Sequence, residues 1–202
     1  MKAVVCLMFA CMLSAPAYAQ APAGGAQGGQ KIPLNEGLRR AYNTMKMNLT
    51  EAAQKLGDAD YSFRPVPEIR SFGGQLAHVA NSQFGACAAA RGEANPNQGQ
   101  NLEQTKTTKA DIVQALADSF TFCDPAFATL TDQSAVELVR QGMNEASRAG
   151  ILSNLIAHGN EEYGIMTVYI RLKGMVPPST ERAARGRGAA PAPAPAAPAR
   201  GQ

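Results

Sequence analysis

The sequence predicts an all-α protein, a four-helix bundle with disordered N- and C-terminal segments. Four stretches place apolar residues three or four positions apart, which is the spacing that puts side chains on one face of a helix. No long stretch shows the alternation of apolar and polar residues that is typical of a half-buried strand. The 202 residues leave room for one ordinary domain, which we expect at 33–179.

The first 19 residues have the pattern of a secretory signal peptide. Lys2 supplies a positive charge, Ala3 to Leu13 form an apolar run, and the small residues Ala17 and Ala19 predict cleavage before Gln20. The apolar run is shorter than the ~20 residues that a membrane-spanning helix needs, and no later stretch replaces it. We therefore expect a periplasmic or secreted protein whose mature chain has no integral membrane segment.

Both ends beyond the domain have compositions that cannot form a core. Residues 20–32 are rich in glycine and predict a flexible linker, and residues 180–202 form an Ala-Pro repeat with arginines that predicts a disordered, extended tail. Five of the 19 basic residues lie in the leader and tail, against one of the 16 acidic residues. The domain is therefore close to neutral, so we expect no nucleic-acid partner.

The first two helices are separated by a proline-containing connection. Apolar residues repeat across 36–56, with Asn35 as the expected N-cap and Gly57 as the stop. Residues 58–70 carry two prolines and predict an extended connection. A second helix, expected at 72–91 after a Ser71 cap, directs its apolar stripe inward.

His78 lies off the apolar stripe of this second helix. It shares a flank with small or polar residues, namely Gly74, Asn81, Ser82 and Gly85. From this helix alone, two interpretations stay open. His78 faces solvent, or it marks a surface that another element or a ligand can approach.

The third helix follows a polar loop at 92–107. Thr108 with Asp111 resembles a capping box that opens this helix, and Pro125 is expected to kink it or to end its first part. Residues 132–147 are weakly patterned. Val136, Leu138 and Val139 predict a short helical turn there, interrupted by Gly142.

The last helix, expected at 148–173 and closed by Gly174, carries an unusual inward face. Its members recur at steps of three and four: Ile151, Leu155, His158, Glu162, Ile165 and Tyr169. His158 and Glu162 stand one turn apart in this apolar seam, so each needs a partner to be buried without a large cost. A metal ion is one such partner, and a hydrogen bond between the two is the alternative.

The apolar stripes also predict the core and the state of the cysteines. We expect a core that includes Leu38, Met45, Leu76, Phe84, Leu116, Phe120, Leu155 and Ile165. Cys6 and Cys11 leave with the signal peptide, whereas Cys87 and Cys123 lie on inward stripes. An oxidising compartment favours a disulfide between Cys87 and Cys123, and two reduced core cysteines are the alternative.

Two motifs together resemble the DinB-like superfamily of four-helix proteins. They are PEIRSFGGQLAHVANSQF, which contains His78, and LIAHGNEEYGIMTVYIRLKGMVPPS, which contains His158 and Glu162. The resemblance covers roughly Pro33 to Ser179. It implies a divalent metal held by three histidines, one on the second helix and two at i and i+4 on the last. The corresponding positions are His78, His158 and Glu162, so glutamate replaces the third histidine.

The resemblance also sets the expected chemistry. A His-His-Glu set suits Zn, Ni, Fe or Mn as the divalent metal. Such a cofactor implies metal-dependent hydrolysis or transfer on a small molecule of unknown identity, and export favours hydrolysis over use of a cytosolic thiol. No individual catalytic residue is assigned. The alternative is a non-catalytic periplasmic binding or interaction module with a degenerate metal site.

The resemblance is compatible with a homodimer. Asn154, Glu161 and Tyr163 are candidates for orienting the ligands.

Overall fold

The computed structural model describes residues 29–188. The predicted signal peptide, most of the predicted linker and the end of the predicted tail lie outside the described residues. Residues 32–188 belong to one unit, which contains every element named below.

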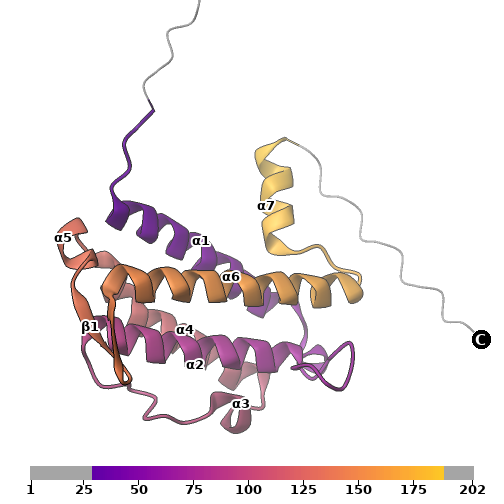
Figure 1. The fold of residues 1–202 in the computed structure, drawn as a ribbon. Coiled ribbons are helices and arrows are strands. Elements are labelled where there is room, and N and C mark those ends of the chain that lie inside the picture. The colour runs from indigo at the N-terminus through magenta and orange to yellow at the C-terminus, as the bar shows by residue number, and fades with distance from the viewer. Residues whose placement is uncertain (1–28, 189–202) are drawn as a thin grey trace, which may run out of the picture. The chain divides into compact units, whose positions relative to one another are not determined.

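Four long helices form this unit, which confirms the predicted all-α bundle (Figure 1). They are α1 (Leu34–Lys55), α2 (Phe72–Arg91), α4 (Lys109–Ala128) and α6 (Arg148–Leu172). Helix α6 packs against α1 and α2, and α4 packs against the same two helices. Side chains of Ser71, Thr108 and Ser147 accept hydrogen bonds from backbone N–H groups of the first turns of α2, α4 and α6. None of the described helices is long and apolar enough to cross a membrane.

Two short helices interrupt segments that were expected to be irregular. The 3-10 helix η1 (Asp58–Asp60) lies in the connection after α1, and α3 (Leu102–Thr105) lies in the loop before α4. Asn101 caps α3 by accepting a hydrogen bond from the backbone N–H of Glu103. The prediction of a plain polar loop at 92–107 was therefore wrong at α3, because a single turn is too short to show helical periodicity.

The segment before α6 is a short helix followed by a hairpin. Helix α5 (Asp132–Ala135) leads to β1 (Leu138–Gln141), which pairs antiparallel with β2 (Asn144–Ser147). Gly142 has φ of +62°, which suits the first position of a two-residue hairpin loop. The helical turn predicted around Val136 to Val139 was wrong, since α5 ends at Ala135 and Leu138 and Val139 belong to β1. Strands of four residues are too short for their alternation to stand out in the sequence.

The predicted boundary of the tail at residue 180 was also wrong. Helix α7 (Pro178–Gly186) continues the fold, with Pro178 in its first turn, where proline is well tolerated. It docks on α1 through an ion pair of 2.6 Å between Lys55 and Glu181. Arg182 adds contacts with Asn48 and Glu51. Part of the charge assigned to the tail is therefore paired within the bundle.

Two helix boundaries differ from the expected ones. Helix α1 begins at Leu34 rather than after Asn35, and the Asn35 side chain instead donates a hydrogen bond to the Leu130 carbonyl. Helix α4 continues through Pro125 to Ala128. Pro125 has no N–H to donate to the Thr121 carbonyl, but the helix continues for one more turn, and the Thr129 N–H bonds to the Pro125 carbonyl.

The core largely follows the predicted stripes. Six of the eight expected residues are buried, whereas Leu38 and Ile165 are half-buried. A disulfide joins Cys87 of α2 to Cys123 of α4, with 5.3 Å between their Cα atoms. It links the two helices at fully buried positions within the main core.

Gly159 permits the close approach of α6 to α1. A Cβ atom at Gly159 would lie 2.2 Å from the Met45 sulfur, and Met45 is fully buried with little room to move. We expect Gly159→Ala to lower the free energy of unfolding by about 1–3 kcal/mol, measured by urea denaturation. Gly164→Ala is the matched control, since nothing lies within 4 Å of its Cβ position. It should stabilise the same helix by about 0.5–1 kcal/mol, and equal effects of the two substitutions would contradict this packing.

Candidate metal centre

Helices α2 and α6 run antiparallel and bring three predicted residues together. Ser82, in the middle of α2, contacts His158, in the middle of α6. Arg148, the first residue of α6, contacts the Ala90 carbonyl near the end of α2. In this arrangement His78, His158 and Glu162 each offer a ligand atom, all within 4.8 Å of one another. The three side chains form a group that could hold a metal ion.

Glu162 lies at the centre of the group. Its Oε1 atom is 3.8 Å from Nε2 of His78 and 3.9 Å from Nδ1 of His158. Both distances exceed a hydrogen bond, so the hydrogen-bonded His158–Glu162 pair considered above is not formed. Neighbouring ligands in a tetrahedral zinc shell are about 3.4 Å apart. The two distances from Glu162 are therefore close to ligand spacing, and the three ligand atoms together lie within 4.8 Å of one another.

The Glu162 carboxylate is buried without a hydrogen bond. The residue is only 5% exposed, and its Oε2 atom has no hydrogen-bond partner among residues 29–188. Burying a carboxylate without hydrogen bonds or a counter-charge is costly, so buried charges are normally paired or bind metals. The donor set therefore fits a cation bound between α2 and α6.

Both histidines have a hydrogen-bond partner on the ring nitrogen that faces away from Glu162. Nδ1 of His78 lies 2.9 Å from Oε1 of Glu103, and Nε2 of His158 lies 3.1 Å from Oγ of Ser82. When these outer nitrogens donate, the inner nitrogens present lone pairs toward Glu162. Metal-binding histidines commonly have such a partner, which fixes the tautomer and the ring orientation.

Glu103 is itself held in place by Arg70. Its Oε2 atom accepts a hydrogen bond of 2.9 Å from Nε of Arg70. Burial raises the pKa of Glu103, but hydrogen bonds from Arg70 and His78, together with their charges, outweigh it and lower the pKa below its usual value. Glu103 therefore remains an acceptor for the His78 ring.

Sequence reasoning did not find Glu103 or the role of Ser82. Ser82 stands four residues after His78, on the flank described above, so the helical spacing carried a signal for it. Glu103 lies in α3, and no local pattern places this short helix beside His78. Of the other candidates, Glu161 approaches Nδ1 of His158 to 4.0 Å, whereas Tyr163 donates a hydrogen bond to Ser179 and Asn154 is exposed.

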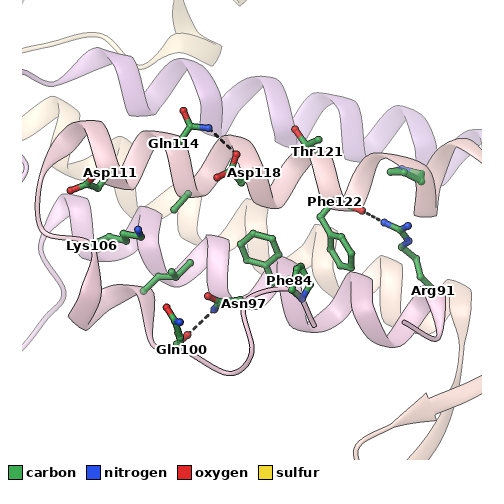
Figure 2. A pocket seen from close by; sticks show the side chains of 14 residues that line it. Phe84, Arg91, Asn97, Gln100, Lys106, Asp111, Gln114, Asp118, Thr121 and Phe122 are labelled. Carbon is green, nitrogen blue, oxygen red and sulfur yellow. Dashed lines mark hydrogen bonds between the residues drawn. The ribbon is translucent and has the colours of Figure 1, made fainter. Parts of the chain in front are cut away.

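The groove drawn in Figure 2 does not contain this centre. It has a volume of about 730 Å³ and lies between α2, α4 and the loop between them (Figure 2). Its floor includes Phe84 and Phe122, and several of its polar side chains are already paired, as with Gln114 and Asp118. No histidine lines it. In the His-His-Glu group, by contrast, the buried Oε2 atom of Glu162 has no hydrogen-bond partner among residues 29–188.

The protein is a helical bundle with potential metal ligands on its second and last long helices. Comparison with known protein families identifies the class of protein that has this arrangement. The sequence profile of the DinB superfamily matches residues 41–166. The chain belongs to the DinB superfamily, which confirms the resemblance seen in the two motifs. No curated protein matches the chain significantly.

Solved structures share this fold at low sequence identity. A DinB-like protein from Bacillus cereus is 19% identical, with a TM-score of 0.61, and the match covers 71% of this chain and 95% of the other. A DinB-like protein from Bacillus subtilis is 18% identical, with a TM-score of 0.56 and coverages of 69% and 94%. A conserved protein from Enterococcus faecalis is 13% identical, with a TM-score of 0.57 and coverages of 70% and 97%. These likenesses show the fold alone.

Proposed function

We propose that this chain is an exported, metal-dependent member of the DinB superfamily that hydrolyses, or transfers a group to or from, a small substrate. His78, His158 and Glu162 hold the divalent ion. The observation that carries the proposal is the buried Glu162 carboxylate, which faces two imidazole nitrogens and has no hydrogen bond among the described residues. A bound cation supplies the missing partner.

Three side chains around the metal centre orient its ligands or can accept a proton. A divalent ion bound there supplies a Lewis acid that activates a water molecule or a thiol. Glu103 and Ser82 hold the outer nitrogens of the two histidines, so the inner nitrogens keep their lone pairs. Glu161 is 72% exposed and lies 4.0 Å from Nδ1 of His158, where its carboxylate can accept a proton released at the centre.

Metal titration of the purified protein tests the proposal. We expect one Zn²⁺ to bind per chain by calorimetry, and His158→Ala to weaken binding by more than ~100-fold because one of three ligands is lost. Glu103→Gln keeps every ligand but loses a charged acceptor of His78, so a loss of ~10–100-fold is expected.

Arg40→Ala is the control for these variants, since its side chain pairs with Glu36 at the start of α1. It should leave zinc affinity unchanged. Failure of the unsubstituted protein to bind zinc, nickel, iron or manganese would overturn the proposed function. Binding that His158→Ala does not weaken would overturn the ligand assignment.

The disulfide supports the export part of the proposal. Disulfides persist in oxidising compartments and are rare in reducing ones, and Cys87 and Cys123 form one within the core. We expect the mature protein, recovered from the periplasm or the medium of an expressing bacterium, to begin at Gln20, as read by N-terminal sequencing. Recovery only from the cytoplasm with residues 1–19 intact would contradict export.

A further inference from the structure

A second groove lies further along the contact between α2 and α6 (Figure 1). Two helical turns after Glu162, the Tyr169 hydroxyl donates a hydrogen bond of 2.9 Å to the Arg70 carbonyl, just before α2 begins. The groove lies at this contact, roughly 10 Å along α6 from the metal centre. It has a volume of about 640 Å³ and is lined by Glu68, Ile69, Arg70, Gln75, Ile165 and Tyr169.

The Arg70 side chain connects this groove to the metal centre. Its Nε atom donates a hydrogen bond of 2.9 Å to Oε2 of Glu103, whose Oε1 atom lies 2.9 Å from Nδ1 of His78. One carboxylate and one imidazole ring therefore separate the guanidinium from the nitrogen that faces Glu162. A small molecule can span this separation, so a group bound by Arg70 can hold another group of the same molecule at the metal centre.

Arg70 keeps hydrogen-bond donors that no protein group uses. The contact with Glu103 involves Nε, and neither Nη atom has a hydrogen-bond partner among residues 29–188. The side chain lines the groove and is 42% exposed, so a solute in the groove can reach it. Because Glu103 already holds the guanidinium in place, a ligand of the Nη groups costs little further side-chain order.

The lining of the groove favours a singly charged carboxylate with an aliphatic chain. A guanidinium matches the planar, two-oxygen geometry of a carboxylate. Ile69 is 36% exposed and Ile165 is half-buried, and both add aliphatic surface to the groove that Arg70 lines. Glu68 also lines the groove, but it is exposed, so solvent screens its charge. Together with Glu103 it disfavours a doubly charged anion.

We propose that this groove is a substrate subsite in which the Nη groups of Arg70 bind a carboxylate of the substrate. The aliphatic part of the substrate lies against Ile69 and Ile165. As a substrate subsite it rests on the proposed metal-dependent function, because the metal centre acts on the other end of the bound molecule. The substrate class is then a small aliphatic carboxylate whose reacting group lies away from the carboxylate. The guanidinium is present in the metal-free chain, so its binding can be measured separately.

Three probes with the same chain length and different charge test the subsite, namely butanoate, butanamide and butylammonium. The protein is stripped of metal and dialysed free of chelator, since a chelator carries carboxylates and a bound metal would itself bind butanoate. We expect butanoate to bind about fivefold more tightly than butanamide, the gain from a solvent-accessible bidentate ion pair. Butylammonium should bind most weakly. The measurement is a ¹H–¹⁵N NMR titration in which the signals of Ile69, Arg70 and Ile165 shift together.

Two substitutions connect the preference to Arg70. Arg70→Gln removes the guanidinium and keeps the backbone carbonyl that Tyr169 binds, so it should bring the affinity ratio of butanoate to butanamide to about one. Arg70→Lys keeps the charge but loses the bidentate geometry, so the ratio should fall to about two. This second variant provides the test if the first does not fold. Arg64→Gln is the matched control and should leave the ratio at about five, because the exposed Arg64 side chain contacts the Pro67 carbonyl and does not line the groove.

The outcomes separate this proposal from the metal centre. Equal affinities of butanoate and butanamide, or tighter binding of butylammonium or inorganic phosphate than of butanoate, would overturn the subsite. So would a fivefold preference that the Arg70 variants leave intact, or one that Arg64→Gln abolishes as well. A zinc titration of the same sample reports the metal centre through the signals of His78 and His158. If zinc shifts neither signal but the carboxylate preference holds, the metal-dependent function fails and the binding groove stands. If zinc binds and the preference is absent, only the subsite fails.

Discussion

Glu162→Gln is expected to abolish stoichiometric metal binding and, at the same time, to stabilise the metal-free protein. The carboxylate is buried between two histidines at 3.8 and 3.9 Å, too far for hydrogen bonds. Without a cation it is a desolvated charge, and a neutral amide of the same shape is less costly to bury. We expect zinc affinity to fall by more than ~100-fold and the free energy of unfolding of the metal-free form to rise by about 1–2 kcal/mol.

Calorimetric zinc titration and urea denaturation in the presence of a chelator measure the two effects. Glu145→Gln is the matched control, since this carboxylate is exposed on β2. Its effect on stability should stay within about 0.5 kcal/mol, and its zinc affinity should be unchanged. Destabilisation of the metal-free protein by Glu162→Gln would contradict this account, because it would mean that the carboxylate has a structural partner.

Replacing Cys87 and Cys123 together with alanine is expected to lower the free energy of unfolding by about 4 kcal/mol. The disulfide closes a loop with a sequence separation of 36 residues, which restricts the unfolded chain. Both cysteines are also fully buried, so the substitutions remove apolar contacts from the main core. Urea denaturation of the variant and of the oxidised protein measures the difference.

The disulfide should not affect the metal centre directly. It joins α2 to α4, whereas the ligands lie on α2 and α6. The folded double variant should therefore bind zinc as the oxidised protein does. Equal stability of the variant and the oxidised protein would contradict the stabilising role of the disulfide, and so would two free thiols titrated in the denatured, unreduced protein.

The sequence was most informative where a long helix repeats its pattern. Phe72–Arg91 was predicted with both of its ends, because Ser71 caps one end and Gly92, with φ of +68°, closes the other. The same periodicity placed His158 and Glu162 on one face of α6. The convergence of that face with His78 required the family resemblance, since periodicity within one helix does not say which flank of another helix it meets.

Short elements and long-range contacts escaped prediction for physical reasons. Glu103 reaches His78 from a single-turn helix whose position depends on contacts such as the hydrogen bond from the Leu102 backbone N–H to Asn81. Ile165 was expected in the core but is half-buried, because it lines the groove beside the metal centre. Departures from the apolar pattern on α2 and α6 therefore coincide with the candidate site.

The position of a bound metal tests the central claim most directly. Crystals of the mature protein grown with zinc can be measured on both sides of the zinc absorption edge. We predict one anomalous peak per chain, about 2.0–2.2 Å from a ring nitrogen of His78, a ring nitrogen of His158 and an oxygen of Glu162. A zinc peak bound elsewhere, or no peak between α2 and α6 at saturating zinc, would contradict the account.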